Sequence, residues 1–119
     1  MIEKTLRMIQ LYDVYGALLT GRQQEFIHLY YEKDLSLSEV AAEFNISRQA
    51  VHDILRNGEA TLKKLEQKLG LVENALHWEQ VLKQVFGLLE DLERNIGKDR
   101  RGLALLAEIR SLLNPSAKV

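Results

Sequence analysis

Side chains that can hydrogen-bond to nucleic-acid bases and phosphates are concentrated between Ser47 and Arg56. Gln49 can pair with adenine through two hydrogen bonds, and Arg48 or Arg56 can bind guanine in the same bidentate way or take a phosphate. His52 can donate to a phosphate or to a base edge. If this segment is a helix that begins after Ser47, its first turn is suited to the major groove of DNA. The alternative interpretation is an ordinary solvated helix face.

Arg22, in the first turn of an earlier predicted helix, is a further candidate for phosphate binding. Its neighbours Thr20 and Gln23 are better explained as helix caps. Asp53 would repel phosphates, although it could accept a hydrogen bond from a cytosine amino group or orient a neighbouring arginine. The candidate nucleic-acid-binding residues are therefore Arg22, Ser47, Arg48, Gln49, His52 and Arg56.

Residue types that serve catalysis or metal binding form no recognisable pattern. The chain has no cysteine, and its histidines, His28, His52 and His77, are far apart in sequence and lack metal-ligand spacing. The sequence has no phosphate-binding glycine loop, no H-E-x-x-H and no G-x-S-x-G. The carboxylates are scattered, as is normal for exposed helix faces. We therefore expect a non-enzymatic protein with no metal and no other cofactor.

The spacing of apolar residues predicts an all-helical chain. The one proline is Pro115, so no proline interrupts a helix upstream. Capping boxes, an N-cap at Ser47 and helix stops at Asn45 and Gly70 divide the chain. Six helices are predicted. The first covers residues 6–19, the second runs from 20 to the polar stretch 32–34, and the third covers 36–45. The fourth covers 47–70, the fifth 73–95 and the sixth 103–113. The first is expected to bury Leu6, Ile9, Val14, Ala17 and Leu18.

The third and fourth predicted helices form a helix-turn-helix over residues 37–56. Two short helices meet in a tight corner only if small and apolar side chains fill its inside, and Ala41 is the tightest position. Asn45 stands where many such turns have glycine, and asparagine tolerates the positive φ that the turn requires. The interior positions are held by Val40, Ala41, Phe44, Ile46, Val51 and Ile54.

Four short segments within residues 18–69 carry a family resemblance. LTGRQ at 19–23, LYY at 29–31, LSLSEVA at 35–41 and SRQAV at 47–51 resemble region 4 of bacterial sigma-70-type factors. With VHDI at 51–54 and the helical C-terminal extension, most of the chain resembles the YlxM-type family of small bacterial helix-turn-helix proteins. The resemblance implies an all-α, sigma-region-4-like helix-turn-helix bundle that binds DNA. Such proteins are typically encoded beside the genes of the signal-recognition-particle GTPase, so it also implies a role in that pathway or in its regulation.

The charge of the first half argues against strong DNA binding. Residues 1–60 contain six Lys and Arg residues against nine Asp and Glu residues, which gives −3. DNA affinity rests largely on neutralising phosphates, so such a protein should bind weakly or depend on a second subunit. Two functions stay open. One is a DNA-binding regulatory protein, and the other is an interaction module that binds a signal-recognition-particle component, protein or RNA.

The fifth predicted helix carries apolar residues at alternating spacings of four and three, which is a heptad seam. The seam consists of Trp78, Leu82, Val85, Leu89, Leu92 and Ile96. It could pack on the first and fourth helices of the same chain, but Phe86 and Leu88 widen the apolar surface and favour a homodimer. We therefore expect a helix-turn-helix domain over residues 1–70 and a dimerising C-terminal helical extension over 71–119.

The 119-residue sequence gives no sign of a membrane segment. It has no run of about 18 consecutive apolar residues, and its N-terminus lacks the continuous apolar region of a signal peptide. A cytoplasmic protein without a membrane contact is the simplest expectation.

Overall fold

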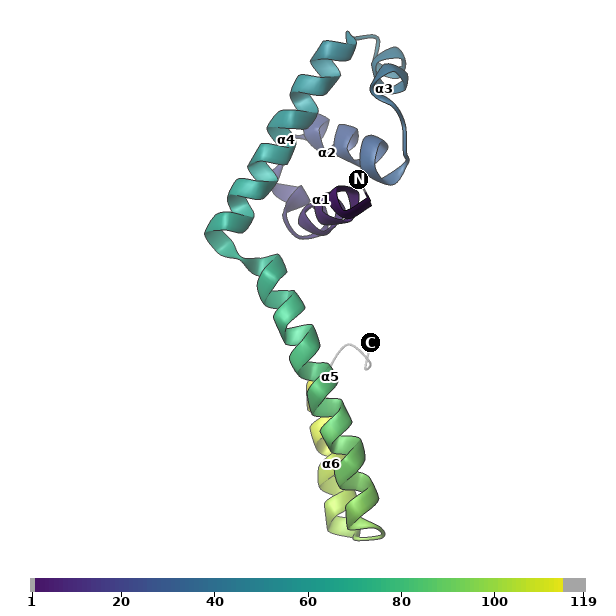
Figure 1. The fold of residues 1–119 in the computed structure, drawn as a ribbon, viewed down its shortest axis with the longest axis vertical. Coiled ribbons are helices and arrows are strands. Elements are labelled where there is room, and N and C mark those ends of the chain that lie inside the picture. Colours follow the sequence, from purple (N-terminus) through teal and green to yellow (C-terminus); the bar gives the residue numbers. More distant parts are fainter. Residues whose placement is uncertain (1, 115–119) are drawn as a thin grey trace. The chain divides into compact units, whose positions relative to one another are not determined.

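The computed structural model describes residues 2–114, and in that range the chain is helical and has no strand, which confirms the all-α prediction. The chain divides into two compact units, Met1–Glu73 and Asn74–Val119. In the first unit α4 packs against α1, α2 and α3 (Figure 1). The elements in chain order are α1 (Ile2–Tyr15), a 3-10 turn η1 (Gly16–Leu18), α2 (Gly21–Ile27), a π-helical turn η2 (His28–Glu32), α3 (Leu37–Phe44), α4 (Arg48–Leu69), α5 (Leu71–Ile96) and α6 (Arg100–Leu113).

Both predicted capping boxes are present and start α2 and α3. The Thr20 hydroxyl accepts the Gln23 N–H at 3.2 Å, and the Gln23 side chain accepts the Thr20 N–H at 3.0 Å. Ser36 and Glu39 make the same pair of bonds at 3.1 and 3.0 Å. Each box satisfies two backbone N–H groups that a helix start would otherwise leave to water.

The buried face of α1 differs from the predicted one. Met8, Leu11 and Tyr15 are buried, whereas Leu6 and Val14 are exposed. Ala17 and Leu18 are exposed as well, and Ile9 is only partly buried. Two stripes with helical spacing run along this segment, so periodicity alone could not distinguish them. The α-helix also ends at Tyr15, and the 3-10 turn η1 replaces its predicted last turn.

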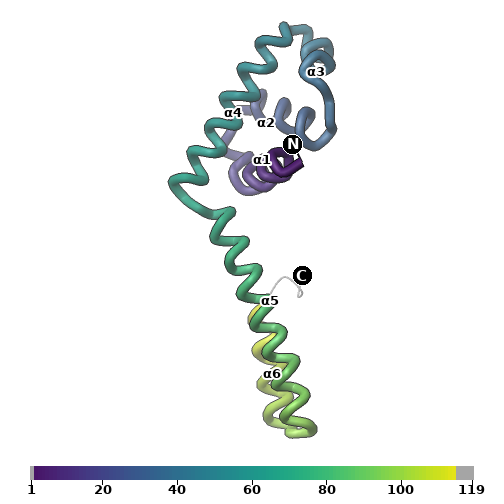
Figure 2. The backbone as a smooth tube through the Cα atoms, viewed as in Figure 1, coloured from purple at the N-terminus to yellow at the C-terminus, as the bar shows by residue number. Residues whose placement is uncertain are grey.

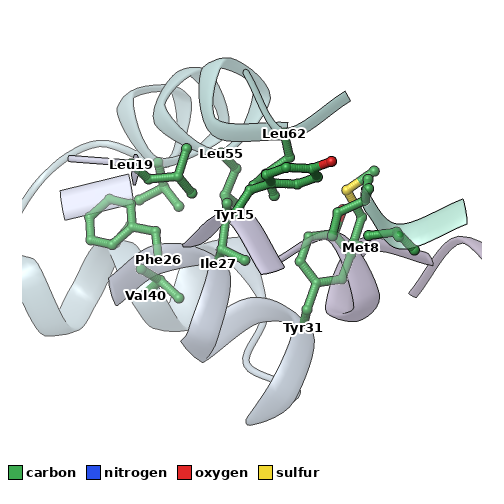
Figure 3. Packing of buried hydrophobic residues seen from close by; sticks show 13 residues of the cluster. Met8, Tyr15, Leu19, Phe26, Ile27, Tyr31, Val40, Leu55 and Leu62 are labelled. Atoms are coloured by element: carbon green, nitrogen blue, oxygen red, sulfur yellow. The ribbon is translucent and has the colours of Figure 1, made fainter. Parts of the chain in front are cut away.

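A single apolar cluster fills the first unit. In the close-up of Figure 3, Phe26 and Val40 lie at one end, Met8 and Tyr31 lie at the other, and Leu55 of α4 lies between them. The Phe26 and Phe44 rings meet edge to face with centroids 4.9 Å apart, which joins α2 to α3.

Gly58 lies in the middle of α4, where glycine lowers helix propensity. It is buried, and a β-carbon built there would lie 2.9 Å from Ile27 Cδ1. The missing side chain therefore lets α2 approach α4 closely.

Two carboxylates are buried on the core face of α4, although the scattered carboxylates of the sequence are typical of exposed helix faces. Glu59 accepts a hydrogen bond of 2.6 Å from the Tyr31 hydroxyl, and Glu66 accepts one of 2.6 Å from the Tyr15 hydroxyl. Lys4 Nζ lies 4.0 Å from Glu59 Oε1. Each buried charge therefore has a donor within the fold, as burial of a carboxylate requires.

Glu66 also caps the start of α5. Its two carboxylate oxygens accept the Val72 and Glu73 N–H groups at 3.1 and 3.0 Å, and the Tyr15 hydroxyl accepts the Leu71 N–H at 3.0 Å. Gly70 ends α4 in the left-handed conformation, with φ 61°. The corner between α4 and the first turn of α5 thus has its exposed N–H groups satisfied by side chains.

These contacts shift the pKa values of the groups involved. Burial raises the pKa of the Glu66 carboxyl, but hydrogen bonds from Tyr15, Glu73 and Val72 and the nearby Arg7 outweigh it, so the pKa lies below its ordinary value. Arg7 Nη2 lies 3.9 Å from Glu66 Oε2. Burial, followed by the hydrogen bond to the carboxylate, raises the pKa of Tyr15 and of Tyr31 above 10.0.

The first prediction concerns the two tyrosine hydroxyls. Tyr31→Phe should lower the free energy of unfolding by about 1–3 kcal/mol, because Glu59 stays buried without its donor. Tyr15→Phe should lower the melting temperature further, since the Leu71 N–H also loses its acceptor. Tyr30→Phe is the matched control, because no hydrogen bond of the Tyr30 hydroxyl occurs in the described part of the chain. Equal thermal melts for all three variants would contradict this account.

The second prediction is a stability plateau between about pH 4.5 and pH 10. A carboxyl whose pKa is depressed by folding contributes stability above its ordinary pKa and loses it as the pH falls below, which applies to Glu66. A tyrosine whose pKa is raised contributes until the unfolded chain ionises above pH 10. Urea titrations across pH measure the loss of unfolding free energy at both ends of this range. Glu66→Gln should reduce the loss at acid pH. The Glu66→Gln variant should still lose some stability at acid pH, because backbone and hydroxyl hydrogen bonds from Ser36 also lower the pKa of Glu39.

Candidate nucleic-acid interface

The helix-turn-helix corner is made by α3, the turn at residues 45–46 and the first turns of α4. Asn45 has φ 55° and ψ 46°, and the Ile46 N–H donates to the Ala41 carbonyl at 3.1 Å. The Ser47 hydroxyl then accepts the Ala50 N–H at 3.0 Å. These contacts confirm the predicted helix stop and N-cap. They also show that the Ser47 hydroxyl is engaged in starting α4.

Apolar side chains close the inside of the corner, as predicted. Val40 and Val51 have no exposed surface, and Ala41 is buried. The remaining interior positions are partly buried and pack on the same cluster: Phe44, Ile46 and Ile54. Because this side of α4 is used for packing, the polar side chains of its first turns lie toward solvent.

The outward side of α4 carries the predicted contact residues. Arg48, Gln49 and Arg56 are exposed, and His52 is partly buried. Arg48, Gln49 and His52 line one shallow surface pocket together with Leu37, the first residue of α3. This pocket therefore brings three of the six predicted residues together.

Asp53 contacts two of these side chains. Gln49 Nε2 donates to Asp53 Oδ1 at 2.9 Å, and His52 Nδ1 lies 3.5 Å from the same oxygen. The sequence left two roles open for Asp53, which were to accept a hydrogen bond from a cytosine amino group or to orient a neighbouring arginine. No hydrogen bond or ion pair between Asp53 and an arginine occurs within residues 2–114. The bond to Asp53 holds the Gln49 amide in place and leaves its oxygen and one N–H for a base.

Arg22 of α2 stacks on two aromatic rings. Its guanidinium carbon lies 5.5 Å from the Phe26 ring centroid and 5.3 Å from that of Phe44, the last residue of α3. Such cation–π contacts orient a guanidinium without using its N–H donors. Arg22 is exposed, so those donors can still reach a phosphate.

Lys4 is a candidate that sequence reasoning missed. It lines a second surface pocket with His52 and Arg56 of α4, together with Tyr30 and Tyr31. Lys4 and Arg56 are far apart in the sequence, and no spacing rule connects them. Only the packing of α1 and η2 beside α4 adds this cation to the candidate interface.

The predicted dimerisation seam is partly covered within the chain. Leu89 is buried and Leu82, Val85 and Ile96 are partly buried, whereas Trp78 and Leu92 are exposed. The helix alongside is α6, which returns antiparallel to α5 after a turn at Gly97 with φ 59° (Figure 2). Ion pairing between Glu93 and Arg110 at 3.3 Å joins the two helices. The sequence had suggested the first and fourth helices as the intrachain alternative.

Residues 2–114 lack two further kinds of feature. No helix in this range combines the length and apolar character needed to cross a membrane. The same residues contain no group of three His, Cys, Asp or Glu side chains placed to hold a metal ion.

Comparison with known proteins places these features in a family. Residues 2–100 match the family model UPF0122, described as "Putative helix-turn-helix protein, YlxM / p13 like". A UPF0122 protein of Geobacillus kaustophilus is 42% identical over 112 residues, which cover 94% of this chain and 99% of the relative. A UPF0122 protein of Desulforamulus reducens is 52% identical over 81 residues, or 68% of this chain and 69% of the relative. The protein YofM of Lactococcus lactis is 42% identical over 93% of this chain and 94% of its own length.

The third prediction tests the turn between α3 and α4. Asn45→Ala should reduce the free energy of unfolding by about 1 kcal/mol, because alanine is disfavoured in the left-handed conformation. Asn45→Gly should restore the stability, since glycine adopts that conformation freely. Asn57→Ala is the control, because Asn57 is exposed in the interior of α4, where alanine is the better helix former. Chemical denaturation in which both alanine variants behave alike would refute the role of Asn45.

Proposed function

The chain belongs to the UPF0122 family of helix-turn-helix proteins, and on that premise we propose that it is a non-enzymatic, DNA-binding regulatory protein. The observation that carries the proposal is the division of α4 into two sides. Val51 and Leu55 are buried against the rest of the unit, while Arg48, Gln49 and Arg56 stay exposed at the same end of the helix. This is the arrangement of a recognition helix whose first turns enter a major groove.

Each exposed side chain has a defined part in this proposal. Gln49 accepts from the amino group of adenine and donates its free N–H to N7, while Asp53 holds the amide. Arg48 binds guanine or a phosphate at the entry of the groove. Arg22, stacked on two phenylalanines, and Lys4, beside Arg56, bind backbone phosphates and fix the orientation of the protein.

Net charge limits the affinity expected for this interface. The −3 balance of residues 1–60 includes Glu59, which is buried under Tyr31, and Glu39, which caps α3. Both carboxylates are engaged in hydrogen bonds within the fold, but their charge still lowers the potential at the interface. A modest, salt-sensitive affinity follows, strengthened by any second subunit that engages an adjoining half-site.

An alternative function is an interaction module that binds a protein or an RNA. The observation in its favour is the number of apolar side chains exposed on the C-terminal unit, among them Leu88 and Leu112. The family resemblance noted from the sequence implies a signal-recognition-particle component as that partner. Under this alternative the exposed side of α4 would be dispensable.

The fourth prediction separates these functions by charge reversal. Fluorescence anisotropy against fragments selected from genomic DNA should show binding that weakens with salt. Arg48→Glu with Arg56→Glu should lower the affinity at least tenfold and reduce the salt slope by about one for each phosphate that is no longer neutralised. Lys64→Glu with Lys83→Glu changes the charge equally at exposed positions and should cost much less.

Two results would count against DNA binding. One is a folded wild-type protein that selects no fragment and shows no salt-dependent binding. The other is an equal decrease of DNA affinity in both double variants. That result would mean that net charge, and not the position of Arg48 and Arg56, determines the affinity. A lysate partner retained by the Arg48/Arg56 variant would support the interaction module instead.

A further inference from the structure

The C-terminal unit has a very small core of its own. Among its described residues, only Leu89 and Leu106 are buried, at 8% and 2% exposed. Units of about 40 residues usually need a disulfide, a metal ion or association with another surface to be stable. The chain has no cysteine, and residues 2–114 offer no metal-binding group. Association is the remaining source of stability.

The two sides of the α5–α6 hairpin differ in character. Successive residues of a helix are rotated by about 100°, so positions can be placed relative to Leu89 and Leu106, where the helices face each other. Glu93 and Arg110 each follow these residues by four positions, and they pair on one side of the hairpin. Because the helices are antiparallel, residues that directly precede Leu89 and Leu106 lie together on the other side.

That other side is apolar over both helices. Leu88 and Leu105 directly precede the facing residues, and Leu92 and Ile109 follow them by three, which returns them to the same side. Leu112 extends this row by one turn. The five residues of this apolar face are 40 to 72% exposed: Leu88, Leu92, Leu105, Ile109 and Leu112.

We propose that this apolar face binds the same face of a second copy of the chain, so that two α5–α6 hairpins form a four-helix bundle. A patch of five such side chains falls in the range of roughly 300–600 Å², which on a soluble monomer is often functional. Buried on both copies, it removes on the order of 1,000 Å² from water, the level at which specific interfaces begin. The bundle gives every helix two neighbours, which one hairpin cannot do.

A second copy fits this face better than a charged partner does. The five residues carry no charge, so two copies meet without burying an unpaired ion. A two-fold axis brings identical patches together, which makes an uncharged patch complementary to itself. The interface differs from the predicted heptad seam, because Leu89 and its neighbours are partly covered by α6. Only Leu92 belongs to both sets.

Molar mass in solution tests the bundle. Light scattering and sedimentation of the full chain at micromolar concentration should give twice 13.7 kDa. Leu88→Glu with Leu112→Glu should give the monomer mass, with the helical circular dichroism retained because both side chains are largely exposed. Leu6→Glu with Leu18→Glu is the matched control, since these residues are 57% and 66% exposed in the other unit, and it should remain a dimer.

A distance measurement adds an independent readout. Since the chain has no cysteine, Glu108→Cys provides a single site for a spin label at the edge of the apolar face. A four-helix bundle should give one interlabel distance below about 40 Å, given helix spacings near 10 Å. Adding the Leu88 and Leu112 substitutions should abolish the dipolar coupling.

A monomeric wild type overturns the proposal, as does a Leu88/Leu112 variant that remains a dimer or a Leu6/Leu18 control that dissociates equally. The samples contain no DNA. The outcome is therefore independent of the DNA-binding proposal.

Discussion

The hydrogen bond from Tyr15 to the buried carboxylate of Glu66 is the contact on which the first unit depends. It joins the end of α1 to the last turns of α4, 51 positions away. The same carboxylate accepts two N–H groups from the start of α5, and the tyrosine hydroxyl accepts a third from Leu71. A buried carboxylate is tolerable only when its oxygens are fully used, so three helices must be in place together. Glu59 and Tyr31 repeat the arrangement two turns earlier on α4.

The position of α4 in turn determines what its other side can do. Its core side uses Val51, Leu55 and Leu62 for packing and the two glutamates for hydrogen bonding. On the opposite side, Arg48, Gln49 and Arg56 are exposed. Some residues of the candidate interface also support the fold: the Ser47 hydroxyl starts the helix, and Lys4 lies 4.0 Å from the buried Glu59. The division of α4 into two sides explains how a small fold can combine a well-defined corner with outward residues that set its partner.

The features that could be predicted from the sequence act over three or four residues. The capping boxes at Thr20 and Ser36, the left-handed Asn45 and the helix end at Gly70 each depend on near neighbours, and all were found. The features that could not be predicted depend on distant residues. Glu66 looks like any helical glutamate until Tyr15 is placed beside it, and Lys4 joins the candidate interface only after α1 packs next to α4. Packing between helices likewise decides which of the two apolar stripes of α1 is buried, and it places α6 against Leu89. The spacing of apolar residues along the sequence determines neither.

The three roles of Glu66 have an evolutionary consequence. A chain that exchanges this glutamate alone leaves the Tyr15 hydroxyl and two N–H groups of α5 without their acceptor. A chain that exchanges Tyr15 alone keeps a buried charge with fewer donors. Neither step is neutral, so divergence at these two positions proceeds by joint replacement. It also requires a new cap for α5, supplied by a residue that now has no such task. Among distant members of the family, positions 15 and 66 should therefore change together, whereas positions 71–73 contribute backbone N–H groups that any residue except proline supplies.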